Sequence, residues 1–282
     1  MILLVGSTGS LGGRVARDLL RNGEPVRVLV RPNSAYRALE EAGAEIVFGD
    51  LKDVDSVARA CAGAAIVITT ANSAKRGGDD NLETVDRRGN RVLIDASRAA
   101  GVGHFIFVSA LGADPESPVQ FVRAKAETEE YLRGSGMEYT IVRPNILMDT
   151  WFPTLVEGAI DQGRPVTLVG EAKRRHSFVA EADVARFILA ALRHPAARNT
   201  ILTLGGPDAL SWRDVVRIYE EVTGRTIEVR TVSPGEPIPG VPDVVSQLAA
   251  GFEHYDSPVP MDEACATFGV SLTSAREFAR RR

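Results

Sequence analysis

The sequence predicts an α/β protein with a doubly wound, Rossmann-type parallel sheet and a smaller C-terminal substrate lobe. Three observations lead to this fold class. Strand-like and helix-like segments alternate through the first half of the 282-residue chain. The strand-like segments are apolar throughout, which is typical of parallel sheets that helices cover on both faces. A glycine-rich turn follows the first apolar run, where such folds bind dinucleotides.

Six apolar runs in the first half predict the strands of this sheet. Between the first two, Leu11, Val15 and Leu19 recur at the spacing of one helix face, and Asn22-Gly23 ends that helix. Asp53 is placed to cap a later helix. The strands are expected at residues 2–5, 26–30, 45–48, 64–69, 105–108 and 139–142. The helices between them are expected at residues 11–22, 34–42, 53–61, 80–100 and 119–133.

After Pro144 the regular alternation loosens. Ser211 with Asp214 three residues later is close to a capping box, so it predicts a helix start. Helices are expected at residues 151–161, 181–193 and 211–223, strands at 166–169, 177–179, 200–204 and 227–232, a proline-rich loop at 233–242 and short helices beyond it. The sequence therefore predicts a dinucleotide-binding Rossmann domain over residues 1–148 and a substrate-binding lobe over 149–282, with about 181–204 returning to the Rossmann core.

Composition excludes several classes of function. The chain has 33 Lys and Arg against 37 Asp and Glu, a net charge of -4, which argues against a dedicated nucleic-acid binder. Cys61 and Cys265 lie far apart and form no Cys/His cluster, so neither a metal site nor a disulfide framework is expected. No apolar run approaches a membrane span, and the apolar N-terminus lacks a basic flank. We expect a soluble cytoplasmic protein, a monomer or homodimer that does not bind membranes.

The glycine-rich turn is the strongest functional motif. The segment Gly6-Ser7-Thr8-Gly9-Ser10-Leu11-Gly12 joins the first strand to the first helix. Gly6 permits a tight turn, Gly9 lets the backbone approach a pyrophosphate, and Gly12 allows close packing of helix and strand. The helix N-terminus offers N–H groups to phosphate. The motif predicts dinucleotide binding; the alternative is a glycine turn that binds no ligand.

The end of the second strand predicts which dinucleotide is preferred. Rossmann domains specific for NAD usually place Asp or Glu there, to bond the ribose hydroxyls. This chain has Arg31, followed by Pro32. A guanidinium in this place can face a 2′-phosphate, so we expect NADP(H) as the cofactor. The alternative is that Arg31 is a solvated loop residue in a chain whose 33 basic residues include only four lysines, Lys52, Lys75, Lys125 and Lys173.

Five segments, in order, carry a family resemblance. They are the glycine turn, the Arg31 turn, Gly49-Asp50-Leu51, Val108-Ser109-Ala110 and Arg143-Pro144-Asn145. The sequence resembles the NmrA-like group of atypical short-chain dehydrogenases/reductases over nearly its whole length. That group includes NADPH-dependent quinone reductases, plant isoflavone-type reductases and members that sense the nicotinamide cofactor without turnover.

The resemblance implies further cofactor contacts. Asp50 would accept a bond from the adenine amino group with Leu51 beside the ring, although Asp50 could instead be a helix N-cap. Both Thr70 and Ala71 would line the cofactor channel. The residues expected near the nicotinamide are Pro144, Asn145 and Ile146, since their segment ends the sixth strand at the sheet's carboxyl edge.

The catalytic residues depart from the usual pattern. Ordinary short-chain reductases use Ser, Tyr and Lys, with the last two spaced as YxxxK. This chain keeps Ser109 and Lys125 but has Phe121 where the tyrosine stands. The expected catalytic set is Lys125 at the nicotinamide ribose, with Ser109 and Asn145 facing the substrate. Ser109 could instead cap a strand end, and Lys125 could be a surface lysine.

Phe121 cannot donate a proton, so the chain lacks the proton donor of the usual alcohol–ketone mechanism. A quinone takes a hydride readily, and its product can collect a proton from water. We therefore expect an NADPH-dependent reductase acting on a quinone or another electron-poor enone or carbonyl acceptor. The alternative is a non-catalytic NADP(H)-binding sensor or scaffold that contacts a protein partner.

Other candidates have a structural interpretation as well. His176 and Asp149 fall where the substrate lobe should meet the cofactor, but both residue types are more often found at the surface. Trp151, Phe152 and Phe178 form either an aromatic wall or the core of the lobe, and the core is favoured. The remaining lysines, Lys52, Lys75 and Lys173, are expected at the surface.

Overall fold

The computed structural model describes residues 1–74, 76–117, 119–241 and 243–281. Lys75 and Pro242 therefore lie outside the described residues. The chain divides into two compact units. The first unit comprises residues 1–144, 184–203 and 267–269, and the second comprises 145–183, 204–266 and 270–282. The assignment of residues 1–148 to cofactor binding and 149–282 to substrate binding stays a prediction.

The first unit is built on the predicted Rossmann-type sheet. Its seven strands lie in the order β3-β2-β1-β4-β5-β6-β8, and β1 pairs in parallel with both β2 and β4. The order reverses between β1 and β4, where doubly wound folds bind ligands. The strands are β1 Ile2–Val5, β2 Val26–Val30, β3 Glu45–Phe48, β4 Ile66–Thr69, β5 His104–Val108, β6 Glu138–Pro144 and β8 Thr200–Leu204.

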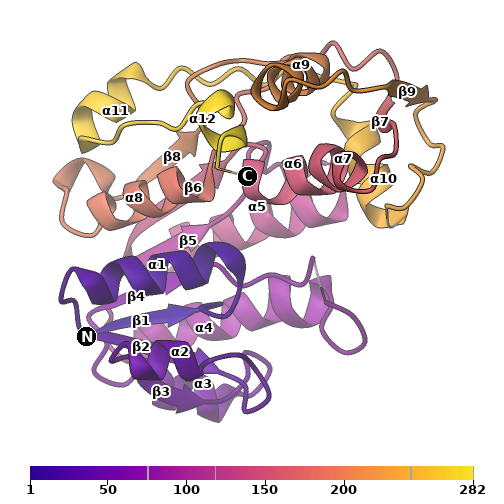
Figure 1. Ribbon diagram of the computed structural model, residues 1–282. Helices are drawn as coiled ribbons and strands as arrows, with labels where there is room; N and C mark the ends of the chain where they lie inside the picture. Colours follow the sequence, from indigo (N-terminus) through magenta and orange to yellow (C-terminus); the bar gives the residue numbers. More distant parts are fainter. Residues whose placement is uncertain (75, 118, 242, 282) are drawn as a thin grey trace. The chain divides into compact units, whose positions relative to one another are not determined.

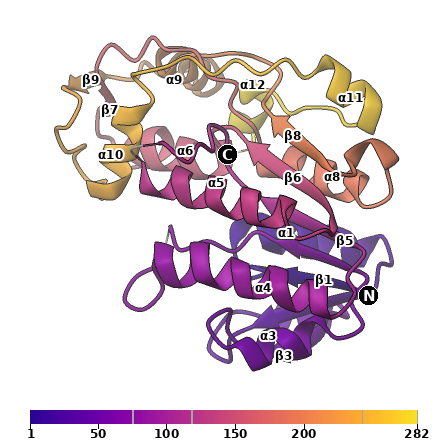
Figure 2. The same ribbon diagram turned by 180° about the vertical axis from the view of Figure 1, so that it is seen from behind.

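Helices cover both faces of this sheet. Figure 1 shows α1 in front of the strands, and the reverse view in Figure 2 shows α4 and α5 in front of the opposite face. Leu3, Phe105 and Phe107 are fully buried in the core beneath them. The helices are α1 Ser10–Arg21, α2 Arg37–Glu41, α3 Val54–Cys61, η1 Leu82–Arg87, α4 Arg88–Ala99, α5 Gln120–Arg133, α8 Glu181–Ala191 and η3 Pro195–Ala197.

Local capping explains where two of these helices begin. Asp53 is the N-cap of α3, as predicted, and its side chain accepts a hydrogen bond from the Asp55 N–H. The helix predicted over 80–100 is divided into π-helical η1 and α4. Asn81 caps η1 through the N–H groups of Glu83 and Thr84, and Thr84 bonds back to Asn81.

The second unit packs around aromatic side chains. Phe152, Phe178, Trp212 and Tyr219 lie in one buried cluster, and Trp151 packs against it, which confirms the core interpretation of these aromatics. Ser211 and Asp214 form the predicted capping box. The remaining elements are α6 Met148–Phe152, η2 Pro153–Glu157, α7 Gly158–Asp161, β7 Val166–Val169, α9 Trp212–Thr223, β9 Val229–Val232, α10 Asp243–Gly251, α11 Asp262–Phe268 and α12 Ala275–Ala279.

Two predictions in the second unit are wrong. The strand expected at 177–179 does not form, because neighbouring residues bond to different segments: His176 N–H to Leu210, Ser177 N–H to Ser257 and Val179 N–H to Ile146. His176 is also fully buried rather than at the surface, since its Nδ1 lies 2.8 Å from the Ser257 hydroxyl. Asp149 is partly buried, and its carboxylate accepts from the Glu181 N–H at 2.7 Å.

In the part of the chain that the structure describes, no helix is both long and apolar enough to cross a membrane.

Candidate functional site

The glycine turn packs backbone against backbone at the point where strand order reverses. Gly6 has a φ of 87°, a left-handed conformation that favours glycine. A Cβ atom on Gly12 would overlap the Gly6 carbonyl oxygen and lie 2.6 Å from the Thr70 hydroxyl. A Cβ on Gly6 would lie 2.8 Å from the Ala71 nitrogen. The turn, the start of α1 and the end of β4 therefore meet, and Thr70 and Ala71 lie beside the turn as expected.

The N-terminus of α1 has the features of an anion site. Gly9 is the N-cap, no side chain caps the helix, and its first turn holds no acidic residue. Gly9 and Ser10 are exposed, whereas Leu11 is buried. Uncapped N–H groups and the positive end of the helix dipole together suit a phosphate group. By contrast, Ser211 and Asp214 close the N-terminus of α9 with reciprocal hydrogen bonds.

Ser7 adds a second indication of a ligand. Its side chain is 2% exposed, and its hydroxyl has no hydrogen-bond partner among the described residues. Buried hydroxyls are normally paired. A bound pyrophosphate would accept hydrogen bonds both from this hydroxyl and from the uncapped N–H groups at the start of α1. The residues of the turn therefore fit a dinucleotide; Thr8, partly exposed, belongs to the same segment.

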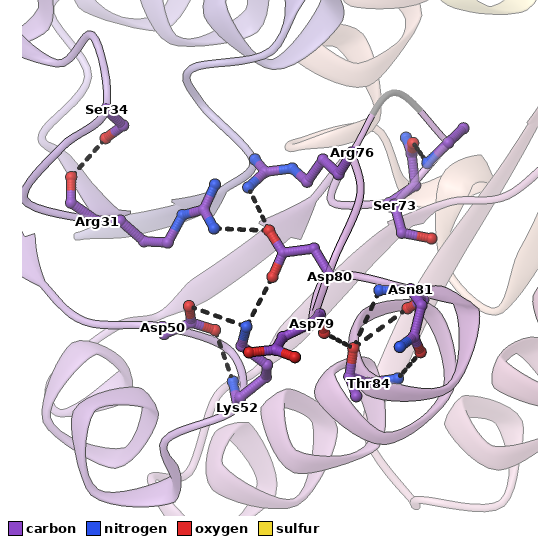
Figure 3. A network of polar contacts seen from close by, with 12 residues as sticks. Arg31, Ser34, Asp50, Lys52, Ser73, Arg76, Asp79, Asp80, Asn81 and Thr84 are labelled. Carbon is purple, nitrogen blue, oxygen red and sulfur yellow. Dashed lines mark hydrogen bonds and ion pairs between the residues drawn. The ribbon is translucent and has the colours of Figure 1, made fainter.

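Arg31 belongs to an ionic cluster that we call the Asp80 cluster. Figure 3 shows the side chains of Arg31, Lys52 and Arg76 directed at Asp80. Arg31 Nη1 lies 2.6 Å and Arg76 Nη1 3.2 Å from Asp80 Oδ2, and Lys52 Nζ lies 2.7 Å from Oδ1. The hydrogen bonds that Lys52 and Arg31 donate to Asp80 lower the pKa of Asp80. The bond between Lys52 and Asp80 also raises the pKa of Lys52. Three cations thus share one carboxylate at the ends of β2, β3 and β4.

Asp50 lies next to this cluster. Its Oδ1 accepts a hydrogen bond of 3.0 Å from the Lys52 N–H, and its other oxygen lies 3.8 Å from Lys52 Nζ. The alternative role as a helix N-cap does not hold, because Asp53 caps α3. Leu51 is buried in the core of the first unit, at 7% exposure. The adenine contacts expected of Asp50 and Leu51 stay predictions.

Lys125 belongs to a second, buried ionic cluster, which we call the Lys125 cluster. Its ammonium donates to the Val108 carbonyl at 3.2 Å and lies 3.9 Å from Asp86 Oδ1. The rings of Phe107 and Phe121 lie 4.9 and 5.4 Å from the same nitrogen. Burial lowers the pKa of Lys125, opposed by the charges of Asp86 and Glu129. The residue is 2% exposed, so the surface interpretation of Lys125 is wrong.

Ser109 is tied into this second cluster. Its hydroxyl donates to Glu129 Oε1, which also accepts from Arg143 Nε at 2.9 Å. Ser109 and Glu129 are 5% and 2% exposed. The second carboxylate, Asp86, accepts from the Ser73 hydroxyl at 2.6 Å through Oδ2, while its Oδ1 has no hydrogen-bond partner among the described residues. The serine hydroxyl expected to face substrate is therefore already paired inside the protein.

Pro144 ends β6 in the first unit, whereas Asn145 and Ile146 belong to the second. Asn145 Nδ2 donates to the Ser257 carbonyl at 2.8 Å, and its Oδ1 accepts from the Ile146 N–H at 2.9 Å. Ser257 also donates its hydroxyl to Asn145 Oδ1 at 3.2 Å. Both ends of this carboxamide are thus bonded within the second unit. The expected position of these residues near a nicotinamide stays a prediction.

Sequence reasoning missed the acidic members of both clusters. Lys52 and Lys173 are exposed, as expected. Lys173 pairs with Glu171, whereas Lys52 belongs to the Asp80 cluster, which the sequence did not indicate. One signal for the first cluster is local: Arg76 and Asp80 are four residues apart in the segment after β4. Glu129 and Asp86 carry no comparable signal, because their ion-pair partners, Arg143 and Lys125, lie 14 and 39 positions away in sequence.

Comparisons with known proteins agree with this geometry. A family model described as NAD(P)H-binding matches residues 6–195. The NAD(P)H azoreductase of Xenophilus azovorans is 30% identical over 227 residues, covering 80% of this chain and 75% of that protein. The Photosystem II assembly factor Ycf39 of Cyanophora paradoxa is 31% identical over 231 residues, covering 82% and 71%.

A solved structure shares the fold. The NADPH-dependent quinone oxidoreductase QOR2 of Escherichia coli, complexed with NADPH, superposes with a TM-score of 0.82 at 21% identity. The superposition covers 100% of this chain and 99% of that one.

Proposed function

Because this chain belongs to the NAD(P)H-binding family, among the NmrA-like atypical short-chain dehydrogenases/reductases, we propose that it is an NADPH-dependent reductase. Its acceptor in this proposal is a quinone or another electron-poor enone or carbonyl compound. The observation that carries the proposal is the uncapped N-terminus of α1, with the orphaned Ser7 hydroxyl beside it and Arg31 at the end of β2. When bound, NADPH supplies a hydride.

Arg31 supports NADPH over NADH. It directly follows β2, where an acidic residue would instead bond the ribose hydroxyls of NAD. A guanidinium binds phosphate through charge-assisted hydrogen bonds. Its side chain is 42% exposed, so it is accessible to a ligand. In this proposal Arg31 holds the 2′-phosphate, and the start of α1 holds the pyrophosphate.

Lys125 is the residue proposed to hold the nicotinamide ribose. Among the described residues its ammonium makes one hydrogen bond, to the Val108 carbonyl, whereas an ammonium has three N–H donors. Its buried position keeps competing water away and favours a ligand hydroxyl as the next partner. A planar arginine would be a poor replacement there.

The acceptor is inferred from what the chain lacks at the YxxxK position. Phe121 has no proton to give, and the Ser109 hydroxyl already donates to Glu129. A quinone suits such a site, because a water molecule can protonate its reduced oxygen after hydride transfer. Two comparisons support an electron-poor acceptor: one relative is an NAD(P)H azoreductase, and one protein of like fold is an NADPH-dependent quinone oxidoreductase.

The test is a direct assay of turnover. The purified protein is mixed with NADPH and a panel of quinones, and the absorbance of the reduced nicotinamide is followed against enzyme-free controls. We expect oxidation above background with at least one quinone, and a lower rate with NADH at equal concentration. Tight NADPH binding without oxidation across the panel would contradict the reductase.

A specific observation favours a second candidate, a non-catalytic NADP(H)-binding sensor or scaffold with a protein partner. The polar groups expected to act on substrate, Ser109 and Asn145, are both bonded within the protein, and the tyrosine is replaced by Phe121. The similarity to the assembly factor Ycf39 gives this candidate further support. The same assay separates the two, since a sensor binds NADPH and does not oxidise it.

A further inference from the structure

In the Asp80 cluster three cations bond to one carboxylate. The Asp80 side chain is 10% exposed, whereas those of Arg31, Lys52 and Arg76 are 33 to 42% exposed. A single carboxylate therefore lies at the centre and three cations surround it (Figure 3). Among the described residues the Asp50 carboxylate lies 3.8 Å from Lys52 Nζ, and the charges of Asp50 and Asp79 also help to raise the pKa of Lys52. The three cations are assembled around one small anion of the protein itself.

We propose that the Asp80 carboxylate is an internal stand-in for the 2′-phosphate of NADPH: it occupies the site formed by Arg31, Lys52 and Arg76, and is displaced when the cofactor binds. This inference rests on the proposed function, since it concerns how the same site takes NADPH. It adds Lys52 and Arg76 as ligands of the phosphate and makes Asp80 a determinant of cofactor preference.

Charge supports the exchange. A phosphate monoester carries close to two negative charges and three acceptor oxygens, whereas Asp80 offers one charge and two oxygens. Each cation spends one donor on Asp80 at 2.6 to 3.2 Å, and both guanidinium and ammonium groups have further donors. A phosphate that reaches the same donors repels the carboxylate, since like charges in one site oppose each other's ionisation. The carboxylate is therefore the group that leaves.

The chain around Asp80 allows this movement. Arg76 and Asp79 are exposed, so few packing contacts hold the segment that leads to Asp80. The next residue, Asn81, caps η1 through its own side chain, and Thr84 returns a bond to the Asn81 N–H. None of these capping bonds uses the Asp80 side chain. The carboxylate can turn away while the start of η1 stays intact.

The exchange predicts that removing the Asp80 charge changes the binding of NADPH but not that of NADH. NADPH has to displace Asp80, so removal of its charge strengthens NADPH binding. NADH has no 2′-phosphate and leaves the carboxylate in place. For Asp80→Asn we expect NADPH to bind about tenfold more tightly, the scale of one charged hydrogen bond, and NADH to change by less than about twofold.

The experiment is calorimetric titration of the full chain without any acceptor, using NADPH, NADH and adenosine 2′,5′-bisphosphate. The variants are Asp80→Asn and a control, Asp79→Asn, which removes the same charge from the adjacent residue. Among the described residues Asp79 forms no ion pair with Arg31, Lys52 or Arg76, although its charge helps to raise the pKa of Lys52. The expected result is tighter binding of NADPH and of the bisphosphate to Asp80→Asn, with a clearly smaller gain for Asp79→Asn. Unchanged or weaker NADPH binding to Asp80→Asn, or an equal gain in Asp79→Asn, would overturn the inference.

A second variant keeps the test independent of how well Asp80→Asn folds. Lys52→Gln should weaken NADPH and bisphosphate binding about tenfold and leave NADH binding unchanged, because Lys52 faces the phosphate. Unchanged NADPH binding by Lys52→Gln would remove Lys52 from the site. Failure of the proposed function looks different: wild-type protein would bind NADPH without oxidising it in the quinone assay, or would bind NADPH no better than NADH, whatever the variants do.

Discussion

The Asp80 cluster and the Lys125 cluster use the same chemistry in opposite surroundings. Both lie in the first unit at carboxyl ends of sheet strands, and both pair cations with Asp or Glu. In the first, three exposed cations share one carboxylate; in the second, one buried ammonium lies 3.9 Å from a carboxylate with an orphaned oxygen. The hydrogen bond that Lys52 donates to Asp80 raises the pKa of Lys52, whereas burial lowers the pKa of Lys125.

This difference shows that burial sets the free-energy cost of exchanging one charged partner for another. Water near the Asp80 cluster screens its charges, so partners can exchange at low cost. In the Lys125 cluster, removing one partner leaves the other charge buried away from water, which strongly destabilises the folded protein. We therefore expect the exposed cluster to govern the choice between cofactors, and the buried one to hold the strand ends, and with them the Lys125 ammonium, in place.

The largest expected effect comes from a buried titratable group, His104. Burial lowers its pKa to about 4 from an ordinary 6.5, and it has no acid partner among the described residues that would offset this. Between pH 6.5 and 4 the unfolded chain binds a proton at His104 and the folded chain does not, so protonation favours unfolding. The contribution of neutral His104 to the free energy of unfolding is therefore fully present above pH 6.5 and is lost as the pH falls toward 4. The loss should reach roughly 3 kcal/mol.

Chemical denaturation of wild type and His104→Gln at several pH values measures this contribution. The variant should lose the part of the slope between pH 6.5 and 4 that His104 supplies. His254→Gln, at an exposed position, is the matched control and should keep the wild-type slope. Identical slopes for wild type and His104→Gln would show that burial does not perturb this histidine.

The next effect concerns the centre of the buried network. Glu129→Ala removes the acceptor of both the Ser109 hydroxyl and the Arg143 guanidinium. We expect the free energy of unfolding to fall by roughly 3 kcal/mol, because Arg143 loses its buried partner. Urea denaturation measures the change. A loss below about 1 kcal/mol would mean that Glu129 contributes no more to stability than a typical surface ion pair, and would contradict this prediction.

Lys125→Ala should weaken NADPH binding about tenfold or more, the scale of losing a charged hydrogen bond to the ribose. Lys173→Ala is the matched control, since this exposed lysine pairs only with the neighbouring Glu171 among the described residues. Titration with NADPH compares the two. If both variants bind NADPH like wild type, Lys125 does not hold the ribose and its role is confined to the buried network.

The smallest effect belongs to the exposed cluster. Asp80→Asn should change the free energy of unfolding by less than about 1 kcal/mol, because the carboxylate pairs with exposed, screened cations. Urea denaturation at low and high salt measures it. A destabilisation as large as that of Glu129→Ala would mean that the two clusters do not differ in the way described.

The fold could be predicted well from the sequence because its signals are local. The predicted bounds of β1, β2, β3, β7 and β8 agree with the structure, since each is an apolar run between turn residues. The family resemblance is confirmed by the match over residues 6–195. The division of the 80–100 helix escaped prediction, because the cap by Asn81 and the π-helical turn leave no periodic signal.

The candidate site could be predicted only in part. The glycine turn is contiguous in sequence, so its geometry follows from its residues. Asp80 bonds Lys52 and Arg31 across 28 and 49 positions, and such contacts depend on how β2, β3 and β4 align. His176 was misplaced for a similar reason: its partner Ser257 lies 81 positions away.

The preference between NADPH and NADH tests the central claim most directly. Dissociation constants of both cofactors are measured by titration for wild type and for Arg31→Ala. The account predicts that wild type binds NADPH at least about tenfold more tightly than NADH, and that Arg31→Ala loses most of this preference by weakening NADPH alone. Comparable affinities in wild type, or an unchanged preference in Arg31→Ala, would contradict it.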